Sequence, residues 1–409
     1  MAGNLAVNIK DIRAAAARIA PLLVPTPIAS SDALCREWGC AVHFKLEMLQ
    51  TTGSFKERGA LNKLLLLNDK EKQCGVIAAS AGNHAQALAH HANLLGVACT
   101  IVMPTNAPLI KVKNTREDGA DVLLHGANYD EALAYARELS DERALTFIHG
   151  FDDDEIVAGQ GTAGLEILDQ CRDVDCIVVP VGGGGLLAGI AIAAKESNPS
   201  IRVIGVEAAA VPSMTAALEA GHVVTIEGKP TIANGIAVRR VGQLCLEIAQ
   251  HYMDDLITVS DEEMAAAVLL LIEREKAVVE AAGAAGVAAM MNGRISGLVG
   301  KRVAVVLSGG NIDVNRLSRI IDKGLVRDAR LVRLRVRVPD VPGQLSRILD
   351  LIAQQCANIL DIQHERAFST AAVGETAIDL TLETRGEEHI QELLRVIAEK
   401  NEVTRLSAG

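Results

Sequence analysis

The sequence predicts an α/β protein with an open parallel sheet, followed by a small antiparallel domain. Over residues 41–308, short apolar runs alternate with amphipathic stretches. Continuous apolar strands separated by helices are typical of parallel sheets that are covered on both faces. After residue 329 the pattern changes to strands of alternating polarity with two helices between them. We therefore place the two domains at residues 1–326 and 327–409.

Composition limits the functions that the chain can have. Its 409 residues exceed one ordinary domain, and 49% hydrophobic against 22% charged residues fit a globular protein with a large core. The net charge of −11 argues against nucleic acid as a partner, because phosphate binding needs a basic surface. The 8 cysteines form no Cys-x-x-Cys pair, and no apolar run suits a signal peptide or a membrane span. We expect a cytoplasmic protein that binds neither nucleic acid nor membrane.

Between residues 41 and 308 the predicted strands and helices alternate. Strands are expected at 41–47, 75–80, 98–103, 121–124, 145–148, 176–181, 202–207, 256–259 and 302–308. Helices are expected at 11–20, 56–67, 85–95, 107–118, 129–138, 155–170 and 186–197. Ligands of such sheets bind beyond the carboxyl ends of the strands, so functional residues are expected in the loops that follow them.

Three of these loops combine small residues with free backbone N–H groups, namely 80–86, 182–186 and 308–311. Four consecutive glycines, Gly182 to Gly185, open a helix. Their backbone N–H groups and the positive end of the helix dipole can surround a phosphate, although a close-packed turn would also explain them. Taken alone, Asn83 would be a turn residue and Ser308 a helix N-cap.

A lysine, Lys56, follows the turn Thr52-Gly53-Ser54 at the start of a predicted helix. Most lysines in such places are surface residues. A partly desolvated lysine near a helix N-terminus, however, loses its proton more easily and can form a Schiff base with a carbonyl. A lysine for an aldehyde, glycines for a phosphate, and an amide and a hydroxyl for ring heteroatoms together suit pyridoxal phosphate.

The same segments resemble a known family. Residues 54–60, 80–86, 182–186 and 307–311 are similar, in this order, to the signature motifs of threonine dehydratases (threonine ammonia-lyases) of the tryptophan-synthase-β-like pyridoxal-phosphate enzymes. The resemblance covers about residues 20–325 and implies fold type II of these enzymes, with two subdomains on open parallel sheets. It also implies β-elimination of threonine, and of serine, to a 2-oxo acid and ammonia.

The resemblance gives each motif a role. Lys56 would carry the cofactor as a Schiff base and later remove the α-proton of the substrate. Phe55 would pack beside the cofactor ring, Asn83 would hydrogen-bond its 3-hydroxyl oxygen, and Ser308 would face its pyridine nitrogen. Glu280, otherwise a helix cap, would approach the cofactor. The phosphate would be held by the backbone amides of Gly182, Gly183, Gly184, Gly185 and Leu186. The substrate carboxylate would be held by Ser80, Ala81, Gly82, Asn83 and His84.

Some positions bear on the choice of activity within the family. Serine racemases carry a second serine in the asparagine loop, and Ala81 stands there in this chain, which favours a dehydratase. Ser308, unlike an aspartate, does not keep the ring nitrogen protonated, which favours elimination over transamination. Relatives with a divalent-cation site have a Glu and an Asp six residues apart. Here Glu207 is followed at that spacing by Ser213, so we expect no metal site.

The tail predicts a ferredoxin-like βαββαβ unit, with strands at 331–338, 358–367 and 375–383, helices to residue 355 and at 388–400, and a last short strand. Arg333, Arg335 and Arg337 share one strand face, which we interpret as solvated or as an interface. The turn at residues 340–345 resembles that of an ACT domain, a regulatory module that binds amino acids between copies. Gly343 would let an effector such as isoleucine or valine approach the backbone. A role in dimerisation alone is the alternative.

Other functions were weighed against a threonine dehydratase. A serine racemase and a 3-hydroxyaspartate dehydratase are the nearest enzymes, and an inactive amino-acid sensor is the nearest protein of another class. A nucleotide-binding dehydrogenase would need Gly-x-Gly-x-x-Gly in the first strand-to-helix turn, which this chain lacks there. We expect a homo-oligomer, dimer or tetramer, with an amino-acid substrate and no metal.

Overall fold

A computed structural model of the chain describes residues 5–365 and 374–406. It divides into two compact units, Met1–Asp313 and Val314–Gly409. The boundary expected after residue 326 differs from this division by one element, because helix α14 (Val314–Arg327) groups with the second unit.

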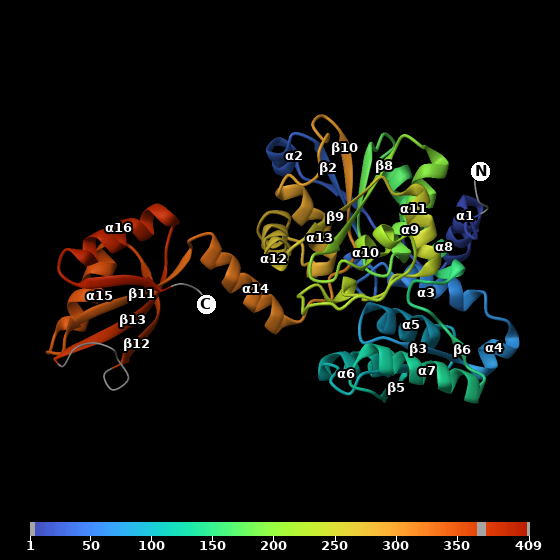
Figure 1. Cartoon of the computed structure of the whole chain (residues 1–409), viewed down its shortest axis with the longest axis horizontal. Coiled ribbons are helices and arrows are strands. Elements are labelled where there is room, and N and C mark those ends of the chain that lie inside the picture. The colour runs from blue at the N-terminus through green and yellow to red at the C-terminus, as the bar shows by residue number, and fades with distance from the viewer. Residues whose placement is uncertain (1–4, 366–373, 407–409) are drawn as a thin grey trace. The chain divides into compact units, whose positions relative to one another are not determined.

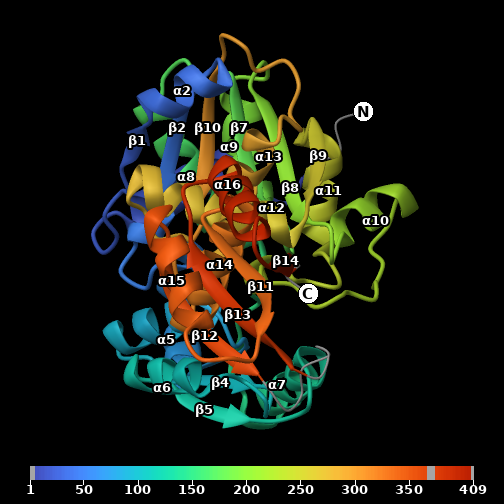
Figure 2. The same cartoon turned by 90° about the vertical axis from the view of Figure 1, so that its left-hand side faces the viewer.

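The first unit contains two sheets (Figure 1). The larger one has the order β1-β2-β10-β7-β8-β9, and β1 alone among its described strands runs antiparallel to its neighbour. Figure 2 shows β1 and β9 at its two edges. The smaller sheet, β5-β4-β3-β6, is parallel throughout. The strands are β1 (Ile28–Ser30), β2 (Ala41–Leu46), β3 (Val76–Ala79), β4 (Cys99–Met103), β5 (Asp121–Leu124), β6 (Thr146–Phe147), β7 (Cys176–Pro180), β8 (Arg202–Ala208), β9 (Asp255–Val259) and β10 (Arg302–Leu307).

Helices connect and cover these strands. They are α1 (Ile9–Ile19), α2 (Asp32–Trp38), α3 (Lys56–Leu65), α4 (Asp69–Cys74), α5 (Asn83–Leu94), α6 (Leu109–Glu117), α7 (Tyr129–Arg143), α8 (Asp154–Gln170), α9 (Gly185–Ser197), α10 (Ser213–Ala220), α11 (Gln243–Tyr252), α12 (Asp261–Leu270) and α13 (Ala281–Met291). Short helical turns lie at η1 (Glu47–Leu49), η2 (Asn234–Ile236) and η3 (Leu271–Glu275).

The strands predicted between residues 41 and 308 are all confirmed, with ends that shift by one residue at most. Every residue of β3 and of β7 is buried, as expected for strands covered on both faces. The sequence analysis missed β1, which has 3 residues and pairs antiparallel at the sheet edge. A strand this short gives no periodic signal.

Small residues bring three helices into close contact beneath the site. A Cβ on Gly159 of α8 would lie 2.6 Å from the Cα of Gly59 in α3. A Cβ on Gly189 of α9 would lie 2.8 Å from the Cα of Gly161 in α8. Because the aromatic content is 2%, the core relies on such backbone contacts and on aliphatic packing, and α3 is thereby held firmly against α8.

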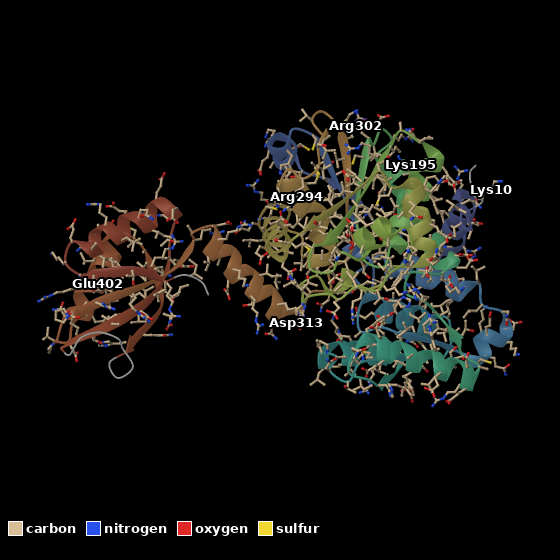
Figure 3. The ribbon with its side chains drawn as sticks, in the orientation of Figure 1. Lys10, Lys195, Arg294, Arg302, Asp313 and Glu402 are labelled. Carbon is tan, nitrogen blue, oxygen red and sulfur yellow. The ribbon has the colours of Figure 1, made fainter. Side chains whose placement is uncertain are left out.

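The carboxyl end of β10 marks one edge of the larger sheet. Arg302 begins β10, and Asp313 follows its carboxyl end. Figure 3 labels the two residues at opposite ends of the part of the unit that contains the larger sheet. Arg302 pairs with Asp173, and Lys195 at the end of α9 pairs with Asp254. These charged pairs lie at the amino-terminal edge of the strands, away from the edge where the motif loops emerge.

The second unit has the order β11-α15-β12-β13-α16-β14 after α14, which confirms the predicted βαββαβ pattern. Its antiparallel sheet is ordered β12-β13-β11-β14, and a core of aliphatic residues joins it to both helices. The three arginines of β11 are partly exposed and pair with carboxylates of the neighbouring strands; Arg335, for example, donates two hydrogen bonds of 2.7 Å to Asp379. The elements are β11 (Leu331–Pro339), α15 (Gln344–Gln354), β12 (Asn358–Glu365), β13 (Glu375–Glu383), α16 (Glu387–Ala398) and β14 (Glu402–Leu406). Residues 366 and 367, predicted as strand, lie outside the described ranges.

Within the described ranges, the helices are all too short or too polar to cross a membrane.

Candidate active site

Two loops at the carboxyl edge of the larger sheet are bound to each other. The Phe55 N–H donates to the Ser308 carbonyl oxygen at 3.1 Å, and the Gly310 N–H donates to that of Gly53 at 2.9 Å. Between these two bonds, Ser54 and Gly309 form an isolated β-bridge. The end of β10 therefore fixes the residue that precedes Lys56, and with it the start of α3.

Lys56 is half-buried at the first position of α3. Its Nζ donates to the Gly150 carbonyl oxygen at 2.6 Å and lies 5.1 Å from the centroid of the Phe55 ring. Burial lowers the pKa of Lys56 to about 8, against the opposing influence of Cys245 and Glu280. An amine with this pKa is partly unprotonated near neutral pH, as a Schiff-base lysine requires.

The tetraglycine loop forms a cradle without side chains. A Cβ on Gly183 would collide with the ring of Phe151, and one on Gly185 would lie 2.9 Å from the Phe151 carbonyl oxygen. Gly184 has φ +101°, and a Cβ there would also press on Cys245 at 2.7 Å. Helix α9 begins here, buried, and the N-cap residue offers no side chain to its first N–H groups. Buried N–H groups at a helix start need an acceptor, and a phosphate is a suitable one.

Asn83 and Glu280 are hydrogen-bonded to each other next to the two joined loops at residues 53–55 and 308–310. The Asn83 Nδ2 donates to Glu280 Oε1 at 2.6 Å, and the Glu280 N–H donates to the Gly309 carbonyl oxygen at 3.0 Å. Glu280 is the N-cap residue of α13, yet its side chain makes no capping bond, so the helix-cap explanation does not hold for its carboxylate. Burial raises the pKa of Glu280, while the hydrogen bond from Asn83 and the charges of Lys111 and Lys56 oppose the rise.

The loop before α5 presents mainly backbone. Ser80 Oγ accepts a bond of 3.2 Å from the Gly82 N–H, and Gly82 leaves the start of α5 without a side-chain cap. The ring of His84 points inward, where Nε2 is 3.3 Å from the Ile148 carbonyl oxygen. Burial and the charge of Lys56 lower the pKa of His84 to about 3, so the ring is neutral. An anion at this loop would be held by helix N–H groups and not by a histidine charge.

A further loop, residues 149–153 after β6, was missed by the sequence analysis. Gly150 accepts the bond from Lys56, the Phe151 ring covers Gly183, and Phe151 O accepts from Cys245 Sγ at 3.3 Å. Asp152 accepts 3.0 Å bonds from two N–H groups at the start of α11. The rule that functional loops follow strand ends applies to this loop as well, because the strand at 145–148 was predicted.

Two hydroxyl groups in the turn at residues 52–54, just before Lys56, have no hydrogen-bond partner in the part of the chain that the structure describes. Thr52 Oγ1 and Ser54 Oγ are buried and have no hydrogen-bond partner within the described ranges. Buried polar atoms are normally hydrogen-bonded, and unmatched ones next to a candidate ligand site are expected to face a ligand.

Elsewhere in the unit, Glu207 accepts 3.0 Å bonds from the N–H groups of Met214 and Thr215, so its carboxylate caps the start of α10.

Comparison with known proteins agrees with this geometry. A family model for the pyridoxal-phosphate dependent enzymes matches residues 19–309. The chain belongs to the pyridoxal-phosphate dependent enzyme family. Among relatives of the chain, an L-threonine ammonia-lyase of Thermotoga maritima is 44% identical over 400 residues, which cover 98% of this chain and 99% of that protein.

Solved structures support both the family and its fold. The processed form of threonine deaminase isoform 2 from Solanum lycopersicum has a TM-score of 0.73 and 34% identity, covering 78% of this chain and 97% of that one. Maize serine racemase has a TM-score of 0.74 and 35% identity, covering 79% and 99%. The α/β fold, the family and the pyridoxal-phosphate cofactor predicted from the motifs are confirmed.

The residues of this pyridoxal-phosphate dependent enzyme fit its cofactor. The glycine cradle has buried helix N–H groups for a phosphate, and Lys56 has an amine that sheds its proton near neutral pH. Asn83 has amide hydrogens for a ring oxygen, and Ser308 is buried, 4% exposed, at the end of β10. The donors for the phosphate, the aldehyde and the ring follow strands of both sheets, and the bonds from Lys56 to Gly150 and from Asn83 to Glu280 join the two sets of loops.

Proposed function

We propose that the chain is a threonine ammonia-lyase that also acts on serine, releasing ammonia and a 2-oxo acid. The supporting observation is the state of Lys56, a half-buried amine whose pKa is lowered to about 8 beside a glycine cradle. The curated relative that spans 98% of the chain is named for the same activity. When bound, pyridoxal phosphate supplies the electron sink that makes the α-proton of an amino acid removable.

The chain's own residues have four tasks in this proposal. Lys56 would hold the cofactor, and its amine would accept the α-proton of the substrate. The backbone at 182–186 holds the phosphate, and Phe55 packs beside the ring. The uncapped start of α5, at residues 80–84, holds the substrate carboxylate. Asn83 donates to the 3-hydroxyl oxygen, with Glu280 as its acceptor on the other side.

Two residues favour elimination over the other reactions of the family. Ser308 would present a neutral hydroxyl to the pyridine nitrogen and, unlike an aspartate, would not keep it protonated, which favours elimination over transamination. Ala81 lies in the asparagine loop, where it has no proton to deliver to the opposite face of the α-carbon. Racemisation is the second candidate, because it is the activity named for the similar maize structure.

The test is an assay of purified protein with cofactor and L-threonine. We expect 2-oxobutanoate and ammonia in equal amounts, a visible absorbance band, and loss of both in Lys56→Ala. Lys195→Ala is the matched control, because this lysine pairs with Asp254 at the opposite edge of the sheet and should leave turnover unchanged. Absence of the band after cofactor addition would refute the proposal. Parallel assays with L-serine and 3-hydroxyaspartate, with chiral analysis of the serine, separate the alternatives.

We further propose that the second unit is an ACT-like domain that binds an amino-acid effector. It contains a cavity of about 210 Å³ at the β11–α15 turn, lined among others by Val338, Asp340, Gly343, Leu345, His364 and Thr376. Gly343 has φ +89° and no atom within 4 Å of a Cβ position, so a ligand can reach the backbone there.

Isoleucine and valine are the effectors to test. Threonine kinetics with either amino acid should change in the wild type and not in Gly343→Ala. Gly386→Ala is the control, since Gly386 also has a positive φ, also precedes a helix of this unit, and also faces open space. Identical kinetics with and without both amino acids would contradict regulation and favour association as the function of the unit. We propose a dimer or tetramer, measurable by light scattering.

A further inference from the structure

Asn311, in the segment between β10 and α14, joins the turn before Lys56 to helix α5 through a single amide nitrogen. Its Nδ2 lies 2.7 Å from the Thr52 carbonyl oxygen, 3.0 Å from Asn83 Oδ1 and 3.0 Å from Gln86 Oε1, and its two hydrogens are shared among these three acceptors. A backbone carbonyl can only accept a hydrogen bond. The contact with Thr52 therefore requires the nitrogen of the Asn311 amide, and not its oxygen, to face this cluster.

The orientation of Asn311 determines that of Asn83. Because Asn311 presents a donor, Asn83 must turn its oxygen towards it and its nitrogen the other way. That nitrogen donates to Glu280 Oε1 at 2.6 Å. Both neighbours of Asn83 thus favour the same one of the two orientations that an asparagine amide can take. The second hydrogen of Asn83 Nδ2 has no partner that the described part of the chain supplies.

Glycines hold this chain of amides in place. A Cβ on Gly53 would lie 2.5 Å from Asn311 Oδ1, so the glycine turn closes directly over the Asn311 side chain. A Cβ on Gly309 would lie 2.7 Å from Glu280 Oε1 and 3.2 Å from Asn83 Nδ2, so only a glycine leaves room for that pair. The backbone bond from Gly310 to Gly53 at 2.9 Å keeps the two turns together.

We propose that Asn311 is a positioning residue that locks the Asn83 amide with its nitrogen towards the 3-oxygen of the bound cofactor. This inference rests on the proposed cofactor site. In the locked orientation the free hydrogen of Nδ2 donates to the 3-oxygen and favours its ionised form. In the reversed orientation the amide oxygen would face that oxygen, and the two would repel each other.

A spectroscopic titration tests the proposal without relying on turnover. The visible band of the cofactor bound to Lys56 changes when the proton shared by its 3-oxygen and the linked nitrogen is lost. In Asn311→Asp, a carboxylate replaces the donor, so two carboxylates compete for the Asn83 nitrogen and the orientation that faces the 3-oxygen is no longer locked. We expect the pKa of the band to rise by about one unit, the size of one charge-assisted hydrogen bond. Asn311→Ala, which leaves Asn83 free to turn, should raise it by less.

Two further variants separate positioning from general damage to the site. Gln86→Ala removes another acceptor of the same amide without touching Asn83, and should leave the pKa of the band unchanged. In an Asn83→Ala background, the neutral change Asn311→Ala should have no further effect on that pKa. A normal band whose pKa is unmoved by Asn311→Asp and Asn311→Ala, or a shift that persists without Asn83, overturns the inference alone. A wild-type protein that binds no cofactor overturns the proposed function as well.

Discussion

The protonation of Lys56 gives a quantitative prediction for cofactor uptake, which requires a free amine. With a pKa of about 8, roughly 9% of the amine is unprotonated at pH 7. With the ordinary pKa of 10.5, the fraction would be about 0.03%, or about 300-fold less. Stopped-flow absorbance can follow the uptake of cofactor by the apoenzyme between pH 6 and 10. The logarithm of the rate should rise with unit slope and level off near pH 8.

The sign of the prediction can be tested with the neighbouring carboxyl group. Glu280 raises the pKa of Lys56, against the larger lowering by burial. Replacing it in Glu280→Gln removes that opposing charge, so the plateau should begin at a lower pH than in the wild type. A rate that keeps rising to about pH 10 would show that Lys56 is solvated, and the argument from burial would fail. A plateau that moves upwards in Glu280→Gln would refute the assigned electrostatics.

Three substitutions extend these tests. Arg58→Met should destabilise the fold by about 3–5 kcal/mol at neutral pH, because it leaves the buried carboxylate of Glu47 without its partner. In the wild type Arg58 helps to lower the pKa of Glu47, whereas the lone carboxylate should have a raised pKa. The loss of folding stability caused by Arg58→Met should therefore be smaller at pH 5 than at pH 8. It should also be smaller when Arg58→Met is made together with Glu47→Gln, and urea unfolding will measure both differences. Gly183→Ala should weaken cofactor binding about 5- to 150-fold in a fluorescence titration, since overpacking against Phe151 costs about 1–3 kcal/mol. Ala81→Ser should add serine racemisation, detectable by chiral chromatography; its absence would contradict the role given to Ala81.

The fold was accessible from the sequence because its strands are long apolar runs. In β7 all five residues are buried, and the run at residues 176–181 stands out for that reason. The second unit shows the opposite pattern, in which Val332, Leu334 and Val336 alternate with arginines, and this alternation predicts one buried face. Edge strand β1 lacked both signals. The motif loops followed from the same logic, since each comes directly after a predicted strand.

Side-chain partners could not be predicted, because they join residues far apart in the chain. Asn83 and Glu280 are 197 positions apart, and Asn311 and Thr52 are 259 apart. From the sequence, helix capping is the ordinary role for Glu280, and only the structure, in which its carboxylate makes no capping bond, excludes that role. For His84 the sequence suggests a charged anion ligand, whereas in the fold its ring is neutral and turned inwards.

The placement of Lys56 also depends on charges that sequence patterns assign to the surface. Arg58, in the first turn of α3, is 0% exposed and forms ion pairs with Glu47 at 2.7 Å and with Glu166 of α8 at 2.5 Å. Lys45 of β2 is equally buried and shares Glu166. A buried network of this kind is a poor source of stability but restricts geometry, because each ion must keep its partners. The ion pairs of Arg58 hold α3 to the larger sheet on the carboxyl-terminal side of Lys56. The hydrogen bond from the Phe55 N–H to the Ser308 carbonyl oxygen holds it on the amino-terminal side. The Lys56 amine is therefore positioned with respect to the glycine loop at residues 182–185, which follows β7 of the same sheet, by contacts within the chain alone.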